Sequence, residues 1–281
     1  MSSSWEQVMQ YSRLISLPEA FLQLKKVLSK DEYSMAEVAL AISHDPALSA
    51  RLLRLVNSPL YASAVEIDTL FRAVNMMGTR QIYDLALATS VAQTFDKIDC
   101  KVIDMPKFWF RSVYCAVAAR LLAQACNVLD CERLFVAGLL YDIGHLLMYR
   151  GVPELCVQAL IEARDTGRAL HLVEQQLCHL DYARVGAELM RQWQLPASLR
   201  ETTEFHIEPQ KALRFPLETS IVHIASKLAG EQEMPKAFHP IKPSALQTCG
   251  LDIKQVLDIR KAAEMQVQDV VNTLFGLQKT A

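Results

Sequence analysis

FVAGLLYDIGHLLMY, residues 135–149, is the segment around which we expect the chain to be organised. It is strongly apolar, and on helical spacing Phe135, Leu139, Asp142 and Leu146 fall on one stripe. A carboxylate on such a stripe is costly unless a cation or a hydrogen-bond donor meets it. The function therefore depends on what meets Asp142.

Length, composition and charge set broad limits on the function. The chain has 281 residues, of which 51% are hydrophobic, so it is long enough to form one large or two modest globular domains. Its formal net charge is -2 and its pI is near 6.4. This balance gives no electrostatic reason to expect nucleic acid as a partner, because duplex binding usually needs a basic face.

Three features of the sequence indicate where in the cell the protein is located. No apolar run is long enough to span a bilayer, so we expect no membrane insertion, and the polar N-terminus lacks the pattern of a signal peptide. Seven cysteines occur, an odd number, and none has the CxxC spacing of zinc or redox sites. We therefore expect a reduced, cytoplasmic protein.

The secondary-structure signals are helical throughout, and we find no convincing period-two strand, so we expect an all-α fold. Ser34 has capping-box spacing to Glu37, and Asp45-Pro46 reads as a helix cap followed by the first helical residue. We favour this over a His44-Asp45 metal motif. Asp68, Asp130 and Asp181 are further expected caps.

A family resemblance rests on the run from Leu17 to Ala62, which contains DPALSARLLRLVNSPLY, and on TRQIYDLALATSVAQTF after Gly78. These segments resemble HDOD domains, all-helical relatives of the HD metal-dependent phosphohydrolases found in bacterial signal transduction. The resemblance implies an HDOD domain over residues 14–228. Its parts would be an N-terminal helical bundle over 14–105 and an HD-like helical half over 106–228.

An HD phosphohydrolase would need histidines and aspartates that converge on a divalent metal, which activates a water molecule as nucleophile. Carried over position by position, the resemblance places arginine, tyrosine and serine at most of the expected ligands. Asp142 and His206 are the two that remain as plausible ligands, and a catalytic metal usually needs three protein ligands. The vestigial positions are Arg111, Tyr141, Asp142, Tyr182, His206 and Ser226.

Arginine at the first of these positions suggests a replacement for the metal charge. A guanidinium can bind a carboxylate through two hydrogen bonds, so we expect Arg111 and Asp142 to form a buried ion pair. Other interpretations stay open. Asp142 can instead cap the turn at Ile143-Gly144, and His206 can be an ordinary histidine at a helix end.

The last third of the chain contains no further motif. Residues 229–251 hold several prolines and read as a loop, and residues 252–276 form an expected amphipathic helix. This helix either packs on its own domain or provides a partner or dimer interface.

Three functions remain open. The first is a non-catalytic HDOD signal-transduction module that binds another protein and has no catalytic residue, metal or other cofactor. The second is an enzyme, a metal-dependent phosphohydrolase that acts on a nucleotide or phosphoester with a divalent cation. The third is a small-molecule sensor in which Arg111 recognises a phosphate or nucleotide.

Overall fold

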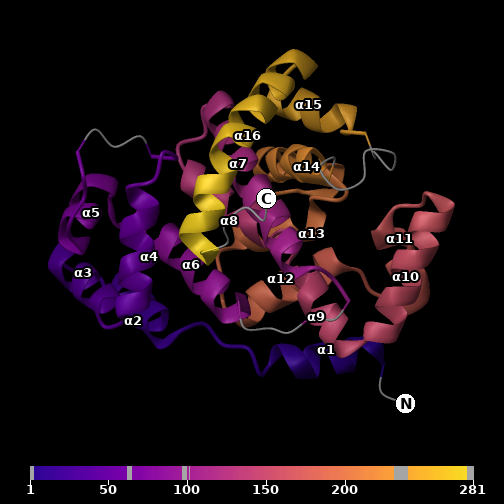
Figure 1. Cartoon of the computed structure of the whole chain (residues 1–281), viewed down its shortest axis with the longest axis horizontal. Helices are drawn as coiled ribbons and strands as arrows, with labels where there is room; N and C mark the ends of the chain where they lie inside the picture. The colour runs from indigo at the N-terminus through magenta and orange to yellow at the C-terminus, as the bar shows by residue number, and fades with distance from the viewer. Residues whose placement is uncertain (1–2, 62–64, 97–99, 101, 231–239, 277–281) are drawn as a thin grey trace. The chain divides into compact units, whose positions relative to one another are not determined.

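In this computed structural model, residues 3–61, 65–96, 100, 102–230 and 240–276 are described, and the expected all-α class is confirmed, with helices but no strand among them (Figure 1). Within the same ranges, no helix is both apolar and long enough to cross a membrane. The chain divides into two compact units. One comprises Met1–Ile15 and Asp99–Ala263, and the other comprises Ser16–Ile98 and Glu264–Ala281.

The smaller unit is built on five consecutive helices whose caps are readable in the sequence. Ser34 and Glu37 form the expected capping box, and Asp45 accepts bonds from Ala47 and Leu48. Thr69, one residue after the expected Asp68, provides the next cap. The helices are α2 (Glu19–Leu28), α3 (Met35–Ser43), α4 (Pro46–Val56), α5 (Leu70–Met77) and α6 (Thr79–Asp96).

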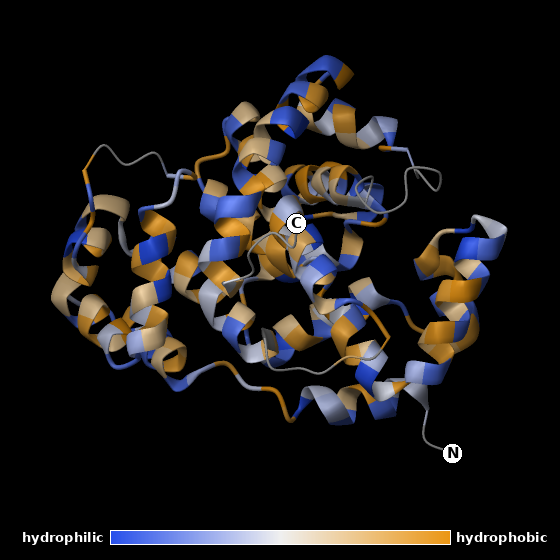
Figure 2. Cartoon of the chain, viewed as in Figure 1, coloured by the Kyte–Doolittle hydropathy of each residue, from blue (hydrophilic) through white to orange (hydrophobic). Residues whose placement is uncertain are grey.

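The core of the smaller unit is made of aliphatic and phenylalanine side chains. Phe21 and Leu24 of α2 are fully buried, as are Ile42 of α3 and Ile82 of α6. α3 packs against α2 and α5, and α6 packs against α2, α4 and α5. Figure 2 shows hydrophobic and hydrophilic residues on the same helices, as expected for helices that bury one face.

The larger unit is organised around α7 (Met105–Ala125), whose residues are buried on most sides. α7 packs against α8 (Cys131–Leu140) and α14 (Pro216–Gly230). The remaining helices of this unit are α1 (Ser4–Ser12), α9 (Ile143–Gly151), α10 (Pro153–Thr166), α11 (Leu170–Cys178), α12 (Tyr182–Gln192), α13 (Ala197–Phe205), the short 3₁₀ helix η1 (Pro209–Lys211) and α15 (Pro243–Cys249).

The apolar stretch at residues 135–149 is not one helix. It is broken at Tyr141 and Asp142, between α8 and α9, where Asp142 has φ -108° and ψ 3°. The expectation of a single continuous stripe is therefore wrong. Asp142 occupies the N-cap position of α9, but its side chain makes no capping hydrogen bond. Asp130 likewise lies at the N-cap of α8 without a capping bond from its side chain.

The C-terminal region differs from the expected loop at 229–251. Part of that range, residues 231–239, lies outside the described residues, but Pro243–Cys249 form α15. Pro243 is in the first turn, where a missing N–H is tolerated, so the proline that suggested a loop begins a helix. The terminal helix α16 (Ile253–Phe275) occupies nearly the range expected for it, and Val256, Val267 and Val270 of its stripe are buried.

Candidate functional site

The break between α8 and α9 places a carboxylate inside the larger unit. The Asp142 side chain is 3% exposed, and its Oδ2 contacts Nη2 of Arg111, which α7 presents and which is 23% exposed. We expected these two side chains to meet, and they are in contact in the structure. A buried carboxylate needs such a cation, because desolvation alone would neutralise it.

Asp142 has a second cationic partner. Its other oxygen, Oδ1, contacts Nδ1 of His145, one turn along α9. Burial, the largest influence, acts to raise the pKa of Asp142. Arg111 and then His145 outweigh it, so the pKa of this carboxyl is lowered below its usual range. Asp142 is therefore ionised at neutral pH.

His145 is held between two carboxylates. Its Nε2 lies 2.8 Å from Oε1 of Glu174, a residue of α11 that is 1% exposed. Burial acts to lower the pKa of His145, but Asp142 and Glu174 together raise it to about 9. Both ring nitrogens thus carry protons and donate to carboxylate oxygens. We call Arg111, Asp142, His145 and Glu174 the ionic network; it contains two cations and two anions.

Aromatic rings surround this network. The Tyr182 ring stacks on His145 with centroids 4.0 Å apart and planes 16° from parallel, and the Tyr149 ring stacks at 5.2 Å and 9°. Aromatic faces attract a cation through their quadrupole, so they favour the imidazolium form. Glu174 Oε2 also accepts the backbone N–H of Tyr182 at 3.2 Å, which fixes the start of α12 against α11.

Close backbone contact between α9 and α12 holds Tyr182 over His145. Gly144 has no room for a side chain. A Cβ there would lie 2.6 Å from the backbone nitrogen of Gly186 and would clash with the carbonyl oxygen of Tyr182. Only glycine permits this approach, so the stacking of Tyr182 on His145 depends on Gly144.

His206 forms a neutral branch beside the ionic network. Its Nδ1 donates to the carbonyl oxygen of Thr203 at 2.7 Å, so its Nε2 must accept the Tyr182 hydroxyl at 3.0 Å. Burial is the main reason that the pKa of His206 falls to about 3. Tyr141 places its ring edge-on to His206, with centroids 5.4 Å apart.

His206 and His223 also tie three segments together. The His206 carbonyl accepts Nδ1–H of His223 on α14 at 2.7 Å, and His223 Nε2 accepts the backbone N–H of Lys242 at 3.1 Å. Ser226, expected among the vestigial positions, donates within α14 to the carbonyl of His223. Among the contacts of the described residues, Ser226 does not join the ionic network.

The structure therefore brings five of the six vestigial positions together and adds two residues that sequence reasoning missed. His145 is only three residues after Asp142, a spacing that faces one side of a helix and could have been noticed. Glu174 had a weaker signal, an acid among the buried residues of α11. Its pairing with a residue 29 positions away cannot be read from spacing.

A divalent metal of the HD type does not fit this arrangement. Both Asp142 oxygens accept from cations, both His145 nitrogens donate, and His206 Nε2 accepts from Tyr182. The lone pairs that a metal needs are therefore directed at protein donors, and two cations already neutralise the carboxylates. Across the described ranges, no group of three or more His, Cys, Asp or Glu side chains is arranged to hold a metal ion.

The shifted pKa values of three histidines predict how the free energy of unfolding depends on pH. The pKa of His145 is about 9 in the folded state against 6.5 as its usual value, so its contribution is complete below pH 6.5 and is lost as pH rises through 9. The pKa values of His206 and His223 are lowered, to about 3 and about 4, so stability also falls as pH drops below 6.5. Urea unfolding should show a maximum near pH 6.5.

A His145→Gln variant provides the control for the alkaline side. This variant should be less stable than wild type at pH 6.5. Its free energy of unfolding should fall much less than that of wild type between pH 7 and 9. A wild-type free energy of unfolding that rises steadily from pH 7 to 9 would contradict the assignment of a protonated His145.

Comparisons with known proteins agree with this fold. The HDOD domain model matches residues 14–209. A structure described as a proposed phosphohydrolase from Shewanella amazonensis SB2B is 24% identical, with a TM-score of 0.76, and the match covers 95% of this chain and 98% of that one. A Geobacter sulfurreducens HDOD domain protein of unknown function is 20% identical, with a TM-score of 0.72 and coverages of 97% and 98%.

Two further relatives are longer than the matched region. A proposed signal transduction protein from Marinobacter aquaeolei VT8 is 17% identical, with a TM-score of 0.71, covering 92% of this chain and 59% of that one. An uncharacterised protein from Treponema pallidum (strain Nichols) is 22% identical over 191 residues, 68% of this chain but 37% of that protein. The match to the HDOD model spans well over half of the sequence, and the chain belongs to the HDOD domain family.

Proposed function

We propose that this protein is a non-catalytic HDOD signalling module that acts by binding another protein, and that the metal chemistry of HD phosphohydrolases has been lost from it. The observation that carries the proposal is the ionic network. The Arg111 guanidinium and the His145 imidazolium occupy the carboxylates of Asp142 and Glu174, so no carboxylate of this centre is left to bind a metal or activate water.

The ionic network also supports a structural role for these residues that does not need a metal ion. Four charges, of which Asp142, His145 and Glu174 are buried and Arg111 is partly exposed, balance one another. Each carboxylate makes at least two contacts with protein donors. Satisfied buried networks specify one packing arrangement, whereas a single missing partner leaves a costly charge. In this chain the ionic network and its bond to the Tyr182 backbone join α7, α9, α11 and α12 to one another.

A metal-dependent phosphohydrolase remains the second candidate, because one structural relative is described as a proposed phosphohydrolase. A phosphate or nucleotide sensor is the third. The Arg111 side chain is 23% exposed, so a guanidinium at the edge of the network is partly within reach of solvent. Both alternatives require Arg111 or Asp142 to exchange its present partner for a metal or a phosphate.

The purified full chain should not bind a divalent metal. Elemental analysis is expected to find far less than one Mn, Fe, Ni or Zn per chain, and the melting temperature should be the same after EDTA treatment and after metal addition. Binding at 100 times its dissociation constant would stabilise the folded state by roughly 2.7 kcal/mol, a shift that is easy to detect.

The same samples test for catalysis. With each metal, hydrolysis of nucleotides and simple phosphoesters should not exceed that of an Asp142→Asn variant, and a competent HD phosphohydrolase assayed in parallel is the positive control. Stoichiometric metal together with chelator-sensitive hydrolysis would overturn the proposal. A nucleotide or inorganic phosphate that raises the melting temperature in wild type but not in Arg111→Met would favour the sensor.

Partner binding and a reduced, cytoplasmic location belong to the same proposal. All seven cysteines are free thiols, which suits a reducing compartment. A dimer through residues 252–276 remains a prediction, to be tested by sedimentation. Proximity labelling in the source cells should recover a specific protein with the wild-type chain and should not recover it with the labelling enzyme alone.

A further inference from the structure

The larger unit carries an open hollow between α12 and α13, with a volume of about 420 Å³. The two helices pack against each other, and each lines the hollow with side chains at helical spacing. Trp5 of α1 and Arg214, two residues before α14, complete its wall. We call it the arginine hollow, because four arginines line it: Arg184, Arg191, Arg200 and Arg214.

Three of these arginines have no anionic partner among the described residues. Arg191 is the exception, because it donates two hydrogen bonds to Glu188. The side chains of Arg184 and Arg200 form no hydrogen bond or ion pair within the described ranges, and the guanidinium of Arg214 lies over an aromatic ring, 5.4 Å from its centroid. Nε of Arg200 is shielded from solvent without an acceptor, which is costly for a donor.

The other two glutamates of the arginine hollow are not paired with these arginines. Glu201 Oε1 accepts the backbone N–H groups of residues 213–215 at 2.9, 2.7 and 3.1 Å and so anchors the segment that carries Arg214. Glu204 forms no ion pair in the part of the chain that is described. Burial raises the pKa of its carboxyl, although Arg184 acts to lower it. The lining side chains thus comprise four arginines and three glutamates, in a protein whose formal net charge is -2.

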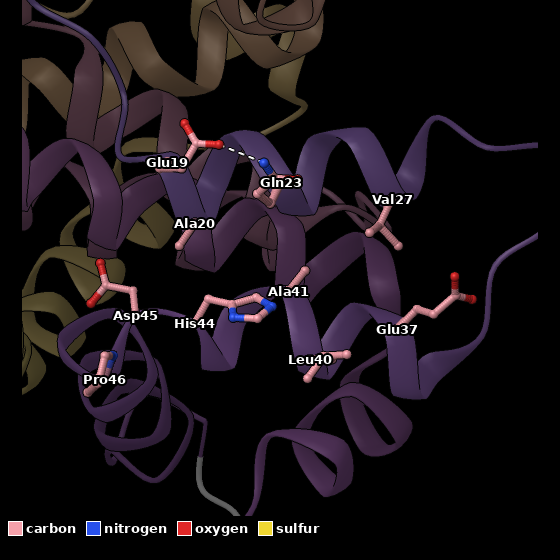
Figure 3. A pocket seen from close by; sticks show the side chains of 10 residues that line it. All are labelled: Glu19, Ala20, Gln23, Val27, Glu37, Leu40, Ala41, His44, Asp45 and Pro46. Carbon is pink, nitrogen blue, oxygen red and sulfur yellow. Dashed lines mark hydrogen bonds between the residues drawn. The ribbon is translucent and has the colours of Figure 1, made fainter.

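A groove of the smaller unit shows the contrast. It lies between α2 and α3, and its charged lining is acidic, with Glu19, Glu37 and Asp45 (Figure 3). Gln23 donates to Glu19, and the other two carboxylates likewise accept from donors of the chain. The acids of that groove are therefore satisfied internally, whereas three arginines of the hollow are not.

Unpaired guanidinium groups that share one hollow favour an anion with more than one negative charge. A phosphate monoester carries close to two negative charges at neutral pH and has three strong acceptor oxygens. Guanidinium groups bind such oxygens through pairs of parallel hydrogen bonds. A carboxylate has a single charge and two oxygens, so it would leave part of the positive charge without a partner.

The arginine hollow is also larger than a phosphate group and has an aromatic wall. Sites for small organic molecules usually have volumes of about 300–1,000 Å³, a range that includes this hollow. Trp5 lines it with 38% of its surface exposed, and Phe205 lines it as well. Aromatic side chains provide faces on which flat rings such as nucleobases stack.

We propose that the arginine hollow binds a nucleotide-sized phosphate ester. The phosphate contacts Arg184, Arg200 and Arg214, and a flat ring of the ligand lies against Trp5. A slight rotation of Arg200 gives its orphaned Nε–H an acceptor. No residue of the ionic network lines the hollow, so this site and the proposed function can fail independently of each other.

The experiment is titration calorimetry of the full chain with AMP, GMP, ribose 5-phosphate, inorganic phosphate and adenosine. AMP or GMP should bind severalfold more tightly than ribose 5-phosphate or inorganic phosphate, and adenosine should not bind detectably. Arg184→Gln and Arg200→Gln should each weaken nucleotide binding about tenfold, as expected for a lost hydrogen bond to a charged group. Trp5→Ala should remove the advantage of the nucleotide over ribose 5-phosphate.

Two further measurements separate a binding role from a structural one. Glu204→Gln removes a negative charge from the arginine hollow, so it should tighten nucleotide binding severalfold, whereas it would weaken the binding of a cation. Arg200→Gln should leave the melting temperature of the ligand-free protein unchanged or raise it, because it removes an unpaired donor. A lower melting temperature would mean that Arg200 supports the fold and would contradict its assignment to the site.

Arg164→Gln is the matched control, because Arg164 lies in the larger unit, has a 66% exposed side chain and does not line the arginine hollow. Its nucleotide affinity should equal that of wild type. Nucleotide binding that survives both Arg184→Gln and Arg200→Gln places the ligand elsewhere, Arg111 included, and overturns the inference. So does inorganic phosphate or adenosine that binds as tightly as AMP, or the absence of binding at millimolar AMP and GMP. Metal-dependent hydrolysis would remove the proposed function but would leave these comparisons valid.

Discussion

Asp142→Asn is expected to destabilise the folded protein by roughly 3–5 kcal/mol, the usual cost of removing one partner from a buried ion pair. Asp142 joins both cations of the ionic network, so the substitution removes the carboxylate that Arg111 contacts there and leaves His145 with Glu174 as its charged partner in the network. Asparagine has nearly the same volume, and the loss is therefore one of charge rather than of packing. The measurement is urea-induced unfolding at pH 6.5.

Asp165→Asn provides the matched control. Asp165 pairs with Arg164 at 2.9 Å, but both side chains are more than half exposed, so the change should be within about 0.5 kcal/mol. A loss at Asp142 as small as that at Asp165 would mean that the ionic network is not formed in solution. A second variant, Asp142→Asn with Arg111→Met, should recover part of the lost stability by removing the stranded guanidinium.

Gly144→Ala is expected to cost at least about 3 kcal/mol or to prevent folding, although it adds a single methyl group. Overpacking of a core usually costs about 1–3 kcal/mol when side chains can shift. Here the new Cβ would meet the backbone of Tyr182 and Gly186, which can move only if α12 moves as a whole. We therefore expect a loss of stability at or above the upper end of the range that is usual for overpacking.

Gly230→Ala is the control for helical glycine. Gly230 ends α14, and a Cβ there meets nothing within 4 Å, so alanine should be neutral or slightly stabilising. For both variants we would measure the melting temperature and the near-ultraviolet circular dichroism of the buried tyrosines. If Gly144→Ala is as stable as wild type, α9 and α12 are not in close contact, and the stacking of Tyr182 on His145 cannot hold.

The parts of the fold that could be predicted from sequence are those set by neighbouring residues. The caps at Ser34, Asp45 and Asp181 each join a side chain to a backbone N–H two or three positions away. Such bonds are encoded locally, and so is the helical class. The cap one residue beyond Asp68 and the helix that begins at Pro243 show how local signals can misplace a boundary.

The candidate site could be predicted only in part from the sequence, because most of its contacts join residues that are far apart along the chain. Arg111 and Asp142 could be paired because a charge in an apolar setting demands a partner and because the family resemblance places Arg111 at a metal-ligand position. Glu174 could not be assigned, because its contact with His145 joins α11 to α9 across 29 positions of sequence and depends on how the helices pack. The helix break at Tyr141 and Asp142 was missed because the apolar spacing continues across it while the backbone turns.

The two positive charges of the ionic network are covalently attached to the chain, and this distinguishes the centre from any site that must capture an ion. Occupancy by a dissolved ion falls when its free concentration drops below the dissociation constant. A guanidinium and an imidazolium cannot diffuse away, so the centre is complete whenever the polypeptide is folded. A cell starved of iron or manganese should therefore keep the same folded fraction of this protein as a cell with plenty.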